Sequence, residues 1–206
     1  VLVFRAVDIK AVPLTGLFES MLVLTIVLSL IYIFLSIAIP QVWFGSIMAW
    51  TILVLVVLAA VVAQPASVPT KLAVTPWVIF HATAMVLSSA LIVFSTASAF
   101  LYLLSCHRLK HKKVMTVLGR VPNLEWLRRA NRLGLKGCFV AQTVGLACGI
   151  GMAAVQSAAL GMDWVDWLTD AQIFLISIAW LLLFLFLCLR RLAGISDKVI
   201  AYVTLL

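Results

Sequence analysis

Charged residues are scarce in this chain of 206 residues: they make up 11% of it, against 65% hydrophobic residues. The mean hydropathy is +1.22. A soluble domain of this length needs much more polar surface, so the composition excludes one and predicts a polytopic membrane protein. The expected fold class is therefore all-α, an integral membrane bundle of about five complete transmembrane helices plus the start of a sixth.

Carboxylates are the rarer charged groups, with seven Asp and Glu against 15 Lys and Arg and a net charge of +8. Most of the positive excess lies in residues 106–136, where Glu125 is the only acid. Positive charge holds loops on the cytoplasmic side, so we interpret 106–136 as a basic cytoplasmic loop with no need for a nucleic-acid partner. Within it, Leu124, Trp126 and Leu127 predict a short amphipathic helix lying on the membrane.

Cysteine is sparse and unpaired in sequence, and no CxxC motif occurs. The four residues are Cys106, Cys138, Cys148 and Cys188. Their wide spacing within or beside apolar stretches excludes a disulfide framework, a zinc site and a thiol redox site. A cleavable signal peptide is not visible either, so insertion is expected to rely on the transmembrane segments themselves.

The long apolar stretches are separated by prolines and short polar segments. Expected spans run over residues 19–39, 42–63, 76–105, 137–160 and 171–192, and a sixth begins near Val199. The chain begins at Val1 rather than at Met, and it stops as the sixth apolar run is starting. We therefore expect residues 1–206 to form a single transmembrane domain that is an internal piece of a longer chain.

Orientation follows from the two basic segments, 106–136 and 190–198, which are predicted to be cytoplasmic. Three segments with unusual residues then lie on the outer side: 13–20, 64–76 and the Trp-containing loop 161–170.

His81 is the only histidine outside the basic loop, and it lies near the outer end of the third span, with Trp77 one helical turn before it. Polar groups at a membrane edge are costly and tend to be functional. One interpretation is an axial ligand to haem iron. The other is a histidine that is hydrogen-bonded to a neighbouring helix or to interfacial water.

The fourth span carries small residues at four-residue spacing, namely Gly145, Gly149 and Ala153. Small residues at this spacing allow two helices to approach closely, so this face is predicted to pack against another helix.

The 161–170 loop contains Trp164, Trp167 and Asp170. Two indole rings could offer a flat stacking surface, or they could simply belong to the aromatic belt at the membrane interface. Asp170 could order the loop by accepting a hydrogen bond, and its position fits equally well an N-cap of the fifth span.

Several short motifs, taken in order, resemble the haem-handling cytochrome c assembly family, in particular its CcsA/HemX-like branch. The matching stretches are Pro13-Leu-Thr-Gly-Leu-Phe-Glu-Ser20, Trp77-Val-Ile-Phe-His81, Val121-Pro-Asn-Leu-Glu125 and Thr143-Val-Gly145 with Gly149. Their order and spacing extend over nearly the whole chain. By the spacing of the family, Trp167 and Asp170 fall on the first and last residues of its Trp-x-Trp-Asp signature.

The sequence also departs from the family pattern. Thr169 stands at the second Trp of the signature, and Cys188 stands where the CcsA branch has an intramembrane histidine. These departures point to the HemX-like branch.

The resemblance implies haem handling at the outer membrane face during cytochrome c biogenesis. His81 would ligate the iron of haem b, with Trp77, Trp164, Trp167 and Asp170 completing the site. It implies apocytochrome c or another assembly subunit as partner, and an integral protein of the bacterial inner (plasma) membrane. The protein would then act within a haem-attachment system rather than as a stand-alone enzyme.

Two alternatives stay open from the residues. A non-haem accessory or scaffold protein of the same family is favoured by Thr169 and Cys188. A small-solute permease subunit is the other, although the spans lack the internal charges that coupled transporters usually carry.

Overall fold

The computed structural model describes residues 17–38, 42–62, 76–110, 123–160, 170–194 and 196–205. Every regular element within these ranges is an α-helix, as the composition predicted. The helices are α2 (Leu17–Ala38), α3 (Val42–Val62), α4 (Pro76–Lys110), α5 (Leu124–Leu160), α7 (Ala171–Ala193) and α8 (Asp197–Leu205). Four of them, α3, α4, α5 and α7, are long and apolar enough to cross a membrane, and α2 contains a shorter apolar stretch. The protein is thus a polytopic helical membrane protein.

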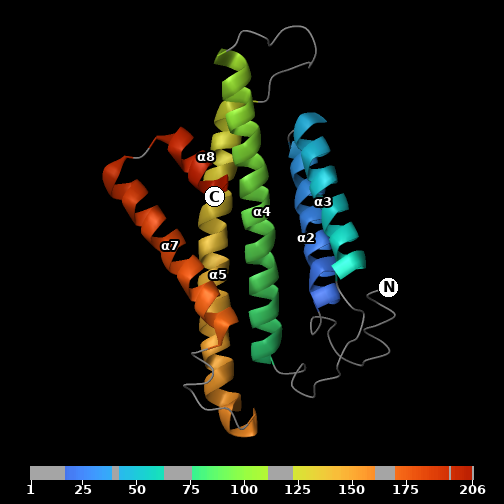
Figure 1. Cartoon of the computed structure of the whole chain (residues 1–206), viewed down its shortest axis with the longest axis vertical. Coiled ribbons are helices and arrows are strands. Elements are labelled where there is room, and N and C mark those ends of the chain that lie inside the picture. Colours follow the sequence, from blue (N-terminus) through green and yellow to red (C-terminus); the bar gives the residue numbers. More distant parts are fainter. Residues whose placement is uncertain are drawn as a thin grey trace.

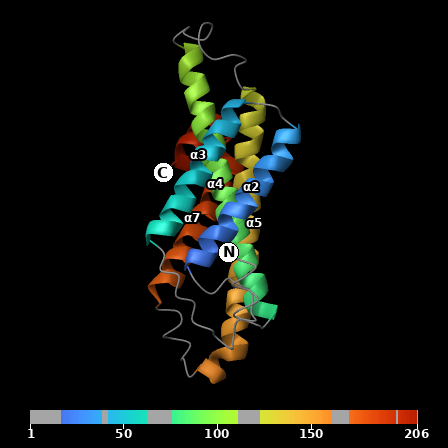
Figure 2. The same ribbon diagram turned by 90° about the vertical axis from the view of Figure 1, so that its right-hand side faces the viewer.

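The helices form three pairs that lie side by side, and α4 and α5 are the central pair (Figure 1). α2 and α3 lie against one side of α4, and α7 and α8 lie on the opposite side (Figure 2). Successive helices run in opposite directions. The start of α4, the end of α5 and the start of α7 therefore lie at one end of the bundle, called here the His81 end, and the other end is called the basic end.

Small side chains let α4 and α5 approach closely. A Cβ added at Gly134 would lie 2.9 Å from Cβ of Ser95. The Ser95 hydroxyl donates a hydrogen bond of 3.0 Å to the backbone carbonyl of Asn131. The polar groups between the two helices are thereby paired inside the protein, as they must be in a membrane, where unpaired groups are costly.

Side chains from four helices form the apolar core on the α2–α3 side. Leu28 and Met48 are fully buried there, and so is Leu127 from α5. The ring of Phe44 lies edge-on to that of Phe94, with 5.7 Å between their centroids. This packing fixes the α2–α3 pair against the central helices.

The prediction of a short amphipathic helix around Leu124–Leu127, lying on the membrane, is wrong. These residues are the first turn of α5, which continues without a break to Leu160. The amide oxygen of Asn123 caps the helix by accepting a 3.0 Å hydrogen bond from the Glu125 backbone N–H. Trp126 contacts the ring of Phe44 at a centroid distance of 5.2 Å, so the apolar residues face the bundle and not a membrane surface.

The predicted spans agree with the helices to within a few residues, except at the basic segment. α4 continues to Lys110 and α5 begins at Leu124, so both ends of the expected 106–136 loop are helical. The 37 residues of α5 extend about 55 Å, well beyond a hydrocarbon core of roughly 30 Å. Such a helix must tilt or protrude from the membrane.

α7 ends at Ala193, and α8 begins at Asp197, both at the basic end. Gly194 adopts a positive φ of 60°, which glycine tolerates without steric cost. Asp197, at the start of α8, accepts hydrogen bonds of 2.8 Å from Arg128 and forms an ion pair of 2.9 Å with Arg132. These contacts hold α8 against α5.

Candidate functional site

His81 lies in the second turn of α4 and contacts α5 through its ring. Its Nδ1 lies 2.7 Å from the backbone carbonyl oxygen of Gly145. A carbonyl oxygen can only accept a hydrogen bond, so Nδ1 is the donor and carries the hydrogen. In the neutral ring, Nε2 then keeps a free lone pair, which is the form of imidazole that binds a metal.

Glycines on α5 make this contact possible. A Cβ added at Gly149 would lie 3.2 Å from Nδ1 and Cε1 of His81. At Gly145, an added Cβ would lie 2.8 Å from Sδ of Met85. Larger residues at these positions would push α4 away and take the imidazole out of reach of the carbonyl. The predicted small-residue packing face is therefore confirmed at Gly145 and Gly149, and it positions His81.

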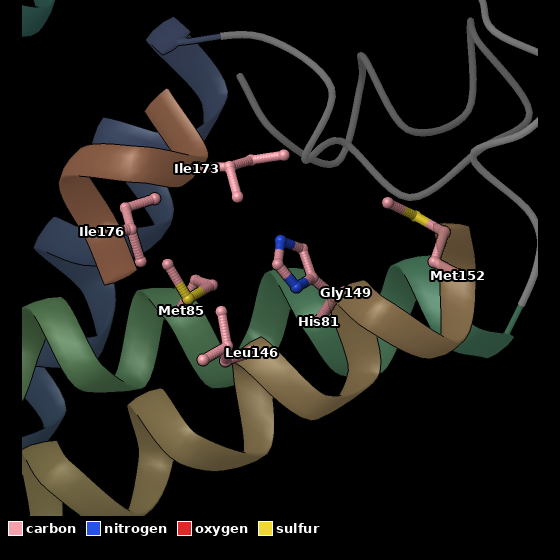
Figure 3. A pocket seen from close by; sticks show the side chains of 7 residues that line it. All are labelled: His81, Met85, Leu146, Gly149, Met152, Ile173 and Ile176. Atoms are coloured by element: carbon pink, nitrogen blue, oxygen red, sulfur yellow. The ribbon is translucent and has the colours of Figure 1, made fainter. Parts of the chain in front are cut away.

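A cavity of about 100 Å³ opens beside the imidazole, between α4, α5 and the start of α7 (Figure 3). Besides His81, it is lined by Met85, Leu146, Gly149, Met152, Ile173 and Ile176. Figure 3 shows the ring pointing from α4 toward Ile173, with one nitrogen on the α5 side and the other facing the cavity. Apart from the imidazole, the side chains that line this space are apolar.

Trp77 lies one helical turn before His81 and shares with it the α5-facing side of α4. A Cβ added at Gly151 would lie 3.0 Å from the Trp77 ring, so the indole packs directly on the glycine. The Trp77 residue nevertheless stays 44% exposed. It therefore presents an aromatic surface at the His81 end without lining the cavity itself.

The remaining predicted site residues are placed only in part. Trp164 and Trp167 lie outside the described residues. Asp170 immediately precedes α7, and its backbone carbonyl accepts a 3.0 Å hydrogen bond from the Phe174 N–H. It therefore occupies the N-cap position that the sequence allowed. Asp170 lies at the same end of the bundle as His81, but it does not line the cavity.

The described residues could offer haem iron one axial ligand, but they do not form a pocket that encloses the haem. Among the described residues, no three His, Cys, Asp or Glu side chains gather as metal ligands. His81 supplies one imidazole with a fixed tautomer, which suits one axial position of haem iron. The cavity of about 100 Å³ is smaller than the roughly 300–1,000 Å³ of typical ligand pockets, so it does not enclose a tetrapyrrole.

Sequence reasoning missed most of the cavity. Met85 follows His81 by one helical turn, so the spacing of Trp77, His81 and Met85 could have indicated it. The contribution of α7 could not be foreseen, because Ile173 and Ile176 belong to an apolar run without any distinguishing pattern.

The fold and the site together define a helical membrane protein with a single imidazole held by a neighbouring helix in an apolar cavity. The chain matches the family model described as cytochrome C assembly protein over residues 14–206. It belongs to that family, which is concerned with cytochrome c biogenesis and is related to haem. No curated protein and no solved structure matches the chain.

Proposed function

We propose that the protein handles haem at the outer membrane face during cytochrome c biogenesis, with His81 as an axial ligand of the iron. The observation that carries the proposal is the hydrogen bond from Nδ1 of His81 to the Gly145 carbonyl. It fixes the tautomer and orientation of the ring and leaves Nε2 available, as backbone carbonyls do for metal-binding histidines in general.

The chain's own residues would divide the work at this site. His81 would bind the iron through Nε2, and the Gly145 carbonyl orients the imidazole ring. The apolar lining from Met85 and Ile173 keeps water from the lone pair of Nε2. Trp77, partly exposed at the same end, offers a flat surface for stacking.

Residues of the 161–170 loop belong to the same proposal. Trp164 and Trp167 would add aromatic surface, and Asp170 would orient the loop from the start of α7. When bound, haem b supplies the iron centre and the vinyl groups that a cytochrome c receives. The partner would be apocytochrome c or another subunit of the assembly system, to which the protein presents its haem.

A second candidate is a scaffold protein that contacts assembly partners without binding haem. The small cavity favours this function, because it does not enclose a haem. The hydrogen bond of His81 is compatible with it, since an imidazole bonded to a neighbouring helix can serve packing alone.

The visible spectrum of the full-length protein, purified from cells with sufficient haem, separates the two. The haem proposal predicts a Soret band that persists through purification. A protein that is folded, monodisperse and colourless under these conditions would establish the scaffold function instead.

A further inference from the structure

A second, larger cleft lies toward the basic end, between α5 and α7. Its volume is about 460 Å³, within the range of clefts that hold drug-sized ligands. Lys136 and Phe139 line it from α5, and Phe184, Leu187, Arg190 and Arg191 line it from α7. Cys188 lies on the same wall.

The cleft lies where α7 and α5 separate. α7 diverges from α5 toward the basic end, and α8 folds back between the end of α7 and the central helices (Figure 1). The ion pairs of Asp197 with Arg128 and Arg132 hold α8 in that place. The cleft is therefore part of the fold, and its opening faces the surroundings of the bundle.

Among the described residues, the three cations that line the cleft form no ion pair. Arg128 and Arg132 pair with Asp197, whereas no ion pair forms to Lys136, Arg190 or Arg191 within the described ranges. Three cations therefore line one opening and make no ion pair with a described carboxylate, although the charge of Asp197 acts on Arg190 from beyond ion-pair distance.

Both walls change from charged to apolar in the same direction. On α7, Phe184 precedes Arg190 by six residues, which places it about 9 Å farther from the basic end. On α5, which runs the other way, Phe139 follows Lys136 and also lies farther from the basic end. Phe139 and Phe184 stack at a centroid distance of 5.9 Å and form the apolar floor.

We propose that this cleft binds an anionic phospholipid of the surrounding membrane. The phosphodiester lies among Lys136, Arg190 and Arg191, and an acyl chain packs along Phe139, Phe184 and Leu187. Basic pockets between transmembrane helices on the cytoplasmic side suit anionic headgroups. The apolar wall of the cleft favours a lipid over a water-soluble anion, because Phe184 and Leu187 on α7 are at least partly exposed and accessible to an acyl chain.

The test is a lipid titration of the full-length protein in detergent micelles, followed by native mass spectrometry. The probes are dioleoyl-phosphatidylglycerol and the zwitterionic dioleoyl-phosphatidylcholine. The cleft variant carries Lys136→Gln, Arg190→Gln and Arg191→Gln. A matched control, Lys110→Gln with Arg129→Gln and Lys198→Gln, removes the same charge at the basic end but outside the cleft.

The wild type and the control are expected to retain phosphatidylglycerol in preference to phosphatidylcholine. The cleft variant should bind phosphatidylglycerol roughly a hundredfold more weakly, given the usual contribution of each basic residue near an anionic lipid. Leu187→Glu provides a single-site test, since it places a carboxylate beside the acyl chain and should weaken phosphatidylglycerol binding without removing a cation.

Equal weakening in the cleft variant and the control would reduce the effect to general attraction and overturn the site. Full displacement of the lipid by soluble glycerol phosphate would overturn it too, because the acyl chain would then contribute nothing. Loss of haemin, rather than of phosphatidylglycerol, from the cleft variant would also overturn the proposed lipid site.

Discussion

The two ends of the interface between α5 and α7 differ in how closely the helices approach and in which polar groups lie there. At the His81 end, α4, α5 and α7 converge on about 100 Å³ that holds one imidazole among apolar side chains. Toward the basic end, α7 diverges and leaves about 460 Å³ with three cations. The Phe139, Trp180 and Phe184 rings stack between the two spaces, with Trp180 and Phe184 nearly parallel at 4°.

The comparison shows two spaces of unlike lining, one between α4, α5 and α7 and the other between α5 and α7. Close packing on glycine fixes one ring in one orientation, which suits a directional bond to a metal. A helix that diverges from its neighbour leaves an open, charged cleft, which suits an amphiphile whose headgroup and chain need not be fixed rigidly. These two spaces should therefore respond differently to substitution and lie on opposite sides of the membrane.

The largest expected effect concerns which side each end faces. Because the basic residues gather at one end, that end is expected in the cytoplasm. In a cysteine-free background, Ala171→Cys should react with an impermeant maleimide added to sealed cells, whereas Lys110→Cys should react only after permeabilisation. The opposite labelling pattern would invert the orientation and place His81 on the inner face.

A substitution at Gly149 tests whether close packing makes the His81 site. Gly149→Leu places a side chain against the imidazole, so we expect loss of bound haem and a destabilisation of about 1–3 kcal/mol from overpacking. The control is Ala147→Leu, at an exposed position of the same helix. Haem content measured by absorbance, together with thermal unfolding, checks both effects. Unchanged haem in Gly149→Leu would show that the ring does not depend on this contact.

The smallest effect is expected for Trp77, which offers stacking surface but no bond to iron. Trp77→Ala should weaken haem retention by about 1 kcal/mol, or roughly fivefold, as for the loss of one aromatic contact. Competition with apomyoglobin measures the rate of haem loss. A loss as complete as that expected for His81→Ala would mean that Trp77 holds the site together instead of stacking at its edge.

Within the described residues, the sequence was sufficient for the approximate ends of the long apolar helices, except for the start of α5. Pro76 occupies the first position of α4, where proline is well tolerated, and long apolar runs in a membrane leave few choices other than helices. A short helix was predicted at Leu124–Leu127, but its continuity with the fourth span was missed because the charges between them resemble a loop. The structure shows one continuous helix there, and Leu127 is buried against the rest of the bundle.

Of the side chains that line the candidate site, only the polar one, His81, could be predicted from the sequence. His81 stood out as a lone imidazole beside apolar sequence, and Gly145 stood out as a packing position. That the ring reaches the Gly145 carbonyl depends on the separation of two helices far apart in sequence, which no local pattern fixes. The basic cleft was not predicted because it depends on the divergence of α7 from α5, which no local sequence pattern indicates.

The central claim is that Nε2 of His81 binds haem iron, and chemical rescue tests it most directly. In the full-length protein, His81→Ala should lose the Soret band while keeping its helical content by circular dichroism. Imidazole added during haem loading should partly restore the band, because it can fill the vacated ligand position. A wild-type Soret band that His81→Ala leaves unchanged in position and intensity would contradict the claim, since the iron would then be held elsewhere.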